Sequence, residues 1–210
     1  MRASRFLLAV IGGLALAAPV GAESSIGVVG GVNLATFHET PAEEGVTFAT
    51  RSLFEAGAVV DIGLGRRLSL RLEPMFLAKG SNINLDFFGK TDTASLRLSY
   101  VELPVLLSLS LGSGSVRPYV LAGPTVGYLT GAKATDQTEN DKDVLSMFVR
   151  TDLGVSFGGG LRFPADKAQV FVEVRYSLGL KNVAKDSGDV IVKNRGVQVA
   201  AGVTFPFGRR

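Results

Sequence analysis

The sequence predicts an all-β protein, an eight-stranded antiparallel up-and-down transmembrane β-barrel, on the strength of three observations. Apolar and polar residues alternate with the period of two that is typical of strands whose faces meet different surroundings. Short and long connections follow one another in strict alternation. One face of the predicted strands carries no charged side chain, whereas the opposite face carries ten.

Composition excludes several kinds of chemistry. The chain has 210 residues, 46% hydrophobic and 20% charged, which fits one folded domain. The lack of cysteine excludes disulfides and thiolate metal sites, and the single histidine, His38, excludes a multi-histidine site. The formal charge of +3 includes Arg2 and Arg5, and without them 20 basic residues face 19 acidic ones. We therefore expect no metal, no cofactor and no nucleic-acid partner.

Residues 1–22 have the three parts of a secretory signal peptide. Arg2 and Arg5 give a positive start, an apolar run covers residues 6–18, and small residues precede the expected cleavage site. A retained membrane anchor is the alternative, but the run falls short of the ~20 residues that a helix needs to span a bilayer. We expect a cleaved, exported precursor whose mature part, residues 23–210, is one outer-membrane β-barrel domain.

Eight segments have strand periodicity, and each is long enough for the ~9–11 residues of a tilted membrane strand. They are Ser25–Phe37, Leu53–Leu64, Leu68–Ala78, Ser99–Leu111, Arg117–Thr130, Asp152–Phe163, Val170–Leu180 and Gly196–Phe207. Five prolines fall inside these segments and remove ladder donors, so we expect bulges or strand ends there. They are Pro74, Pro104, Pro118, Pro124 and Pro206.

The connections between these segments are of two kinds. Three are short, at Gly65–Arg67, Gly112–Val116 and Pro164–Gln169. Four are long and polar, at His38–Ser52, Lys79–Leu98, Gly131–Thr151 and Lys181–Arg195. In an up-and-down barrel this order places all long loops at one end, as in outer-membrane barrels with short periplasmic turns and long external loops.

The charges decide which face meets lipid. All ten lie on one parity, at Glu55, Asp61, Arg71, Glu73, Glu102, Arg117, Asp152, Arg162, Glu173 and Arg175. A water-soluble barrel of the lipocalin kind would place these charges outside, and only a lipid exterior allows an apolar outside with a charged inside. Nine glycines on the charged face favour the lipid arrangement, because they weaken a solvent-facing strand but leave room for long side chains in a lumen.

Several short motifs resemble a known family. They are Tyr100-Val-Glu-Leu-Pro-Val-Leu-Leu107, Pro118-Tyr-Val-Leu-Ala-Gly-Pro124, Phe157-Gly-Gly-Gly-Leu161, Glu173-Val-Arg-Tyr-Ser-Leu-Gly179 and Asn194-Arg-Gly-Val-Gln198. Together they resemble the outer-membrane β-barrel family that includes PorT-like proteins, often described only as porin-family. The resemblance implies an eight-stranded barrel in a Gram-negative outer membrane and in-strand prolines of this kind. Such barrels commonly end on an aromatic residue used in assembly, whereas here Phe207 is followed by three more residues.

Six charged residues are the candidate site: Glu55, Arg71, Glu73, Glu102, Glu173 and Arg175. The interior of an eight-stranded barrel is only wide enough for side chains to fill it. We therefore expect a structural salt-bridge network in the lumen. The alternative is that the same residues line an ion path.

Two other features could indicate a catalytic or a calcium site, and each has a simpler explanation as solvated loop residues. His38 lies near the external mouth, where eight-stranded outer-membrane acyltransferases place a histidine, but a solvated loop histidine needs no orienting partner. Asp136, Glu139, Asp141 and Asp143 could bind calcium weakly, although their spacing misses the EF-hand pattern.

The predicted function is that of a non-enzymatic outer-membrane barrel that acts as a scaffold or through its long loops. A narrow pore and a lipid-modifying enzyme are the alternatives. The expected partners are outer-membrane lipids, the barrel assembly machinery, and another envelope protein or an extracellular ligand at the loops.

Overall fold

The fold is described from a computed structural model. The structure describes residues 24–42, 45–87, 90–135, 141–185 and 188–207, so the predicted signal peptide lies outside the described residues. No helix in these ranges is long and apolar enough to cross a membrane.

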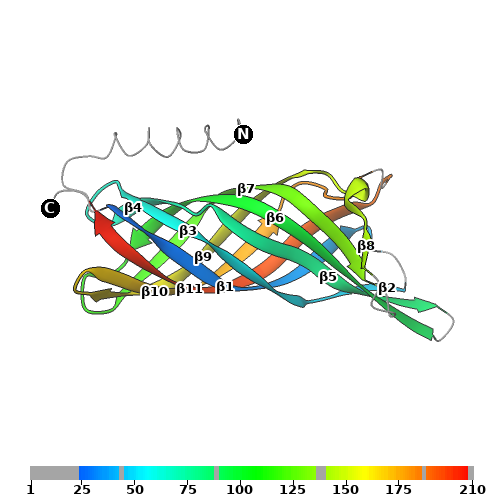
Figure 1. Ribbon diagram of the computed structural model, residues 1–210, viewed down its shortest axis with the longest axis horizontal. Coiled ribbons are helices and arrows are strands. Elements are labelled where there is room, and N and C mark those ends of the chain that lie inside the picture. The colour runs from blue at the N-terminus through cyan, green and yellow to red at the C-terminus, as the bar shows by residue number, and fades with distance from the viewer. Residues whose placement is uncertain (1–23, 43–44, 88–89, 136–140, 186–187, 208–210) are drawn as a thin grey trace.

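The described chain is almost entirely antiparallel strand (Figure 1). Its elements are β1 (Ser24–Thr40), β2 (Val46–Ala49), β3 (Arg51–Gly63), β4 (Leu68–Leu72), β5 (Met75–Phe87), β6 (Lys90–Ser110), β7 (Arg117–Thr135), β8 (Asp141–Asp143), the 3₁₀ turn η2 (Leu145–Met147), β9 (Thr151–Ala165), β10 (Ala168–Gly179) and β11 (Ile191–Phe207). Each wall of the ring pairs antiparallel with the next, in the order β1, β3, β4 with β5, β6, β7, β9, β10 and β11, and β1 pairs with β11 to close the ring. The short strands β2 and β8 pair with β5 and β7.

Strands β4 and β5 form one wall of the barrel, so the ring has the predicted eight strands. Both pair with β3 on one side and β6 on the other, without a change of register. They are separated because Pro74 lacks an N–H, and Pro104 stands opposite Glu73 on β6. The carbonyl of Pro74 still accepts from Ala58 N at 3.0 Å, and Glu73 N donates to Pro104 O at 3.2 Å. The predicted strand Leu68–Ala78 is therefore interrupted at one point only, at Pro74, where a bulge or strand end was expected.

The other prolines have smaller effects on the ladder. Between β6 and β7, pairing lapses where Pro124 stands opposite Val105, and it resumes in the same register. Pro118 and Pro206 are the second and the last-but-one residues of their strands, where a missing donor costs least. The expectation of strand ends thus fits Pro118 and Pro206, whereas Pro104 and Pro124 lie within continuous strands.

Side-chain exposure follows the predicted parity. On β10, Val174 is 52% exposed, whereas its chain neighbours Glu173 and Arg175 are 2% and 1% exposed. The same alternation places Val28, Phe54 and the other apolar row outward around the ring. Of the ten charges on the opposite row, nine are buried, and only Arg117, at the start of β7, is partly exposed. An apolar exterior around a charged interior requires lipid outside.

The predicted long connections are shorter than expected because the strands continue beyond the apolar belt. The segment Lys79–Leu98 is not a loop: β5 and β6 stay paired out to Phe87 and Lys90 and project beyond the rest of the barrel (Figure 1). Strand β7 likewise runs to Thr135, and the remaining connections lose residues to β1, β2, β3 and β11. The hydrophobic alternation stops where lipid ends, but backbone pairing does not depend on it. Sequence periodicity therefore predicted the lipid-facing part of each strand but not where the strand ends.

The exposed row predicts a sharp response to charge. Val174 lies near the middle of β10, so Val174→Arg should destabilise the folded barrel by about 2–4 kcal/mol in liposomes, measured by urea titration. The control is Val174→Leu, which keeps an apolar side chain at the same place and should fold normally. Equal stability of both variants would show that this row does not face lipid.

Candidate functional site

The centre of the lumen holds two arginines and two glutamates from opposite walls. Arg71 is the last-but-one residue of β4 and Glu73 directly follows this strand, whereas Glu173 and Arg175 lie on β10, four strands away around the ring. Arg71 Nη1 lies 2.9 Å from Glu173 Oε2 and 3.4 Å from Glu73 Oε1. Arg175 reaches Glu73 at 2.5 Å and Glu173 at 3.2 Å. Each arginine therefore contacts both acids, and the four form a closed ring of ion pairs across the barrel.

Further groups extend this ring toward the short-turn end. Asp61 accepts two hydrogen bonds from Arg71, at 2.8 and 2.9 Å, which gives the bidentate geometry that guanidinium and carboxylate favour. Tyr119 Oη donates to Glu173 at 2.6 Å. Arg162 stacks 4.0 Å above the Tyr119 ring and donates to Ser108 at 2.9 Å.

Two glycines on β9 provide the room for these side chains. A Cβ at Gly160 would lie 2.7 Å from Tyr119 Oη, and one at Gly158 would lie 3.0 Å from Arg175 Cγ. The glycines of the polar face are thus needed where large side chains cross the lumen.

Glu55 lies beside this ring without touching an arginine. Its Oε2 accepts a hydrogen bond from Gln198 at 2.9 Å, and its Oε1 has no hydrogen-bond partner within the described part of the chain.

Glu102 belongs to a second, separate cluster nearer the long-connection end. Lys79 Nζ lies 2.5 Å from Glu102 and 3.0 Å from Asp152, so one cation is shared by two acids. Asn194 donates to the same Asp152 oxygen at 2.8 Å. The structure therefore brings Arg71, Glu73, Glu173 and Arg175 together, with Glu55 adjacent, but it places Glu102 apart from them.

Lys79 is the functional residue that the sequence interpretation missed. It was assigned to the loop Lys79–Leu98, whereas it lies inside the barrel on β5 with 8% of its surface exposed. The alternation of the strand could have identified Lys79 as inward-facing, because it falls on the same face as Met75 and Leu77, which are both buried. Tyr119, Asn194 and Gln198 were also missed, since uncharged polar residues on the lumen row carry no distinctive pattern.

The formal charges of the lumen, counted with every acid ionised, do not balance. The first cluster has three arginines, Arg71, Arg162 and Arg175, against four acids, Asp61, Glu73, Glu173 and Glu55, which gives −1. The second has one lysine against two acids, which also gives −1. A small cavity between the clusters is lined by Asn33, Lys79, Asn194 and other residues. The amide oxygens Asn33 Oδ1 and Asn194 Oδ1 have no partner among the described atoms, so they are acceptors available to water.

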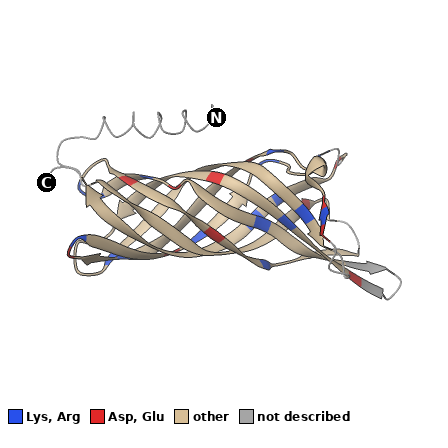
Figure 2. Ribbon diagram, viewed as in Figure 1, with Lys and Arg blue, Asp and Glu red and all other residues tan. Residues whose placement is uncertain are grey.

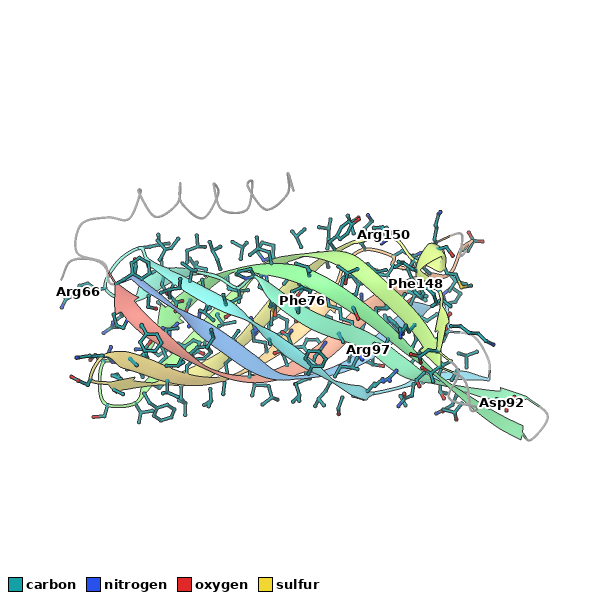
Figure 3. All side chains as sticks on the ribbon, viewed as in Figure 1. Arg66, Phe76, Asp92, Arg97, Phe148 and Arg150 are labelled. Atoms are coloured by element: carbon teal, nitrogen blue, oxygen red, sulfur yellow. The ribbon has the colours of Figure 1, made fainter. Side chains whose placement is uncertain are left out.

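Apolar side chains fill the barrel at the long-connection end. This mouth cluster consists of Phe37, Met75, Leu77, Leu96, Leu98, Tyr100, Leu129, Ala132 and Val183, with Phe48, Val144, Leu145 and Phe148 packed against it. Two connections fold over the opening and join through backbone bonds, because Val149 N donates to Val183 O and Lys185 N to Met147 O, both at 2.9 Å. Figure 3 shows Phe148 and Arg150 at this end, opposite Arg66.

The other candidate residues are His38 and the four acidic residues of the third long connection. His38 is exposed on the outward row of β1, and its ring contacts Thr40 Oγ1 at 3.4 Å. Asp136 and Glu139 lie outside the described residues. Asp141 accepts from Lys133 and Thr135, and the Lys133 bond in particular holds the pKa of its carboxyl below the usual value. Asp143 accepts from Leu145 N. The described residues contain no group of three or more potential metal ligands.

The closed ring, the apolar exterior and the charged interior define a membrane-spanning β-barrel protein. A family model described as an outer membrane protein beta-barrel domain matches residues 17–185, so the chain belongs to that family. Membership of this family places it in the outer membrane.

Solved structures support the same fold. OprG from Pseudomonas aeruginosa superimposes with a TM-score of 0.55 at 12% identity, over 90% of this chain and 97% of that one. Neisserial surface protein A gives 0.52 at 13% identity, over 88% and 97%. The outer membrane protease OmpT from Escherichia coli gives 0.50 at 11% identity, over 88% and 97%. At these identities the likeness concerns the fold alone. The search of curated proteins returned no match.

The ion-pair ring predicts strong coupling between its members. Arg175→Ala leaves buried Glu73 and Glu173 short of a cation and should destabilise the barrel by about 3–5 kcal/mol. Arg175→Ala with Glu73→Ala should cost less than the sum of the two single changes, because an orphaned charge is removed as well. Urea titration in detergent micelles measures all three variants.

The matched control is the exposed pair of Lys133 and Asp141, 2.9 Å apart. Lys133→Ala should leave stability unchanged, because solvent screens an exposed pair. Additive effects at Arg175 and Glu73 would show that the two residues are not coupled.

Proposed function

We propose that this protein is a non-conducting, non-enzymatic outer-membrane barrel that acts as a scaffold or through its long connections. The observation that carries the proposal is that side chains occupy most of the lumen along its length. Buried ion pairs occupy the centre of the lumen. The second cluster, of Lys79, Glu102 and Asp152, lies nearer the long-connection end, and the mouth cluster fills that end. Figure 2 shows that Lys, Arg, Asp and Glu positions occur along the length of the barrel wall. We assign the six lumen residues a structural role on this basis.

Conductance tests the proposal directly. The purified barrel in a planar lipid bilayer should produce no discrete current steps, because paired side chains cross the lumen and leave no continuous water path. An open porin added later to the same bilayer is the positive control. Reproducible steps from the protein alone, altered by Arg71→Lys, would mean that the charges line an ion path.

The narrow pore is kept as the second candidate because of the lumen cavity. Its unpartnered Asn33 and Asn194 oxygens and the excess negative charge would favour a cation over an anion. A catalytic role has less support, since the described environment of His38 contains no carboxylate that contacts it.

The orientation is part of the proposal. Outer-membrane barrels have short periplasmic turns and longer external loops, so the end with β2, β8 and η2 is assigned to the cell surface. A cleaved signal peptide over residues 1–22 and insertion by the barrel assembly machinery complete the proposed route. The motifs quoted above favour a place among the PorT-like barrels. The surface connections would hold an envelope partner or an extracellular ligand.

Single-cysteine labelling tests the orientation, since the natural chain has no cysteine background. Lys142→Cys, on β8, should react with a membrane-impermeant maleimide on intact cells. Arg66→Cys, in the turn before β4, should react only after the outer membrane is permeabilised. The opposite labelling pattern would reverse the barrel in the membrane.

A further inference from the structure

Three cations lie on the outer surface of the barrel, where the lipid-facing rows of β10 and β11 end. Lys193 and Arg195 continue the outward row of β11, which includes Val199 at 43% exposure, whereas the intervening Asn194 is buried in the lumen. Lys181 follows the end of β10, the strand next to β11. All three side chains are partly exposed. We call Lys181, Lys193 and Arg195 the basic patch.

Strand register brings the members of the basic patch together. Within the β10–β11 ladder, Arg195 is in register with Leu178. Beyond the end of β10 the chain stays beside β11, because Val183 N donates to Val192 O at 2.9 Å. The other two cations of the basic patch lie between these two contacts, one on each segment. The three charged side chains therefore leave the wall from neighbouring backbone positions.

The basic patch lies where the apolar exterior gives way to polar groups. Leu180, directly before Lys181, is 57% exposed. Lys181 Nζ donates to Thr151 Oγ1 at 2.7 Å, which holds the ammonium against the outer face of β9. Thr151 is in register with Tyr128, whose side chain is 53% exposed on the outward row of β7. Outward tyrosines are typical of the level at which hydrocarbon meets headgroups.

No acid balances the basic patch within the described part of the chain. None of its three cations forms an ion pair with a described carboxylate. On the other side of β11, Lys193 is in register with His38, which adds no negative charge. Lys133 at the same end of the barrel is different, because it is paired with Asp141 at 2.9 Å. The charge of the basic patch is therefore available to an anion from the membrane.

We propose that Lys181, Lys193 and Arg195 bind a phosphate group on a lipid headgroup. A guanidinium can donate two hydrogen bonds to phosphate oxygens, and the two ammonium groups add positive charge beside it. The exposed apolar side chains of Leu180 and Val199 would contact the acyl chains of the same lipid. The choice of lipid rests on the proposed orientation, in which this is the outer leaflet, so the ligand is a phosphorylated glycolipid of the lipid A class.

Native mass spectrometry of the detergent-solubilised full barrel tests the site. The wild-type protein should retain bis-phosphorylated lipid A and should bind the dephosphorylated form much more weakly. Lys193→Gln and Arg195→Gln should each weaken lipid A binding about fivefold, as expected for loss of one cation at a charged membrane surface. Heat-modifiable migration on gels confirms that each variant is folded.

Lys133→Gln is the matched control. It removes one positive charge from the same end of the barrel, but from a side chain that is already paired with Asp141. This variant should bind lipid A as the wild type does. A loss equal to that of Arg195→Gln would reveal a general electrostatic attraction and overturn the proposal.

Three other results would also overturn it. Unchanged binding in the folded double variant of Lys193→Gln with Arg195→Gln would remove the basic patch from any lipid site. Competition by millimolar inorganic phosphate as strong as that by lipid A would assign the cations to a free anion. A preference for phosphatidylglycerol over lipid A would show that the chosen lipid is wrong. Conductance and cysteine labelling are measured separately, so failure of the lipid site is distinguishable from failure of the proposed function.

Discussion

The structure depends on one constraint, which is that every backbone N–H and C=O inside hydrocarbon must be paired within the protein. Closure of β1 against β11 from Ser24–Phe207 to Thr40–Ile191 meets it by removing both sheet edges. Because side chains alternate along a strand, a closed ladder assigns every second residue to the interior, and a slip of one residue would turn the charged row into lipid. The register therefore fixes which side chains meet lipid and which meet one another.

Pairing in the lumen follows from that assignment. Charged groups in a narrow interior are costly unless they are compensated, and here the compensation runs across the barrel, between residue pairs more than 100 positions apart such as Arg71 and Glu173. The ion pairs thus link opposite walls that share no backbone hydrogen bond. Glu55 Oε1 and Asn194 Oδ1 have no hydrogen-bond partner among the described residues, and Asn194 lines the small lumen cavity.

The two ends of the barrel are built differently. At the short-turn end the strands are joined directly, and Arg66 and Arg67 remain in solvent. At the long-connection end the strands continue past the lipid, two connections bond to each other, and apolar side chains close the opening. Some exposed charges on this side pair with each other, as Lys133 does with Asp141 at 2.9 Å. Charge placement is therefore specific along the axis as well as between inside and outside.

The sequence by itself determined the eight-strand ring, the lipid-facing row and the inward charges, because a period of two and a change of environment are both local properties of the chain. Val174 and Arg175 show this most simply. Only the tertiary structure decided who pairs with whom: Glu102 joins Lys79 and Asp152 instead of the central arginines, and Lys79 lies inside the barrel instead of in a loop. It also decided where strands end, since β5 and β6 continue to Phe87 and Lys90 after the apolar pattern has stopped. Contacts across a lumen depend on the register of the strands, their tilt and the reach of side chains from segments that are distant in sequence. Local periodicity determines none of these.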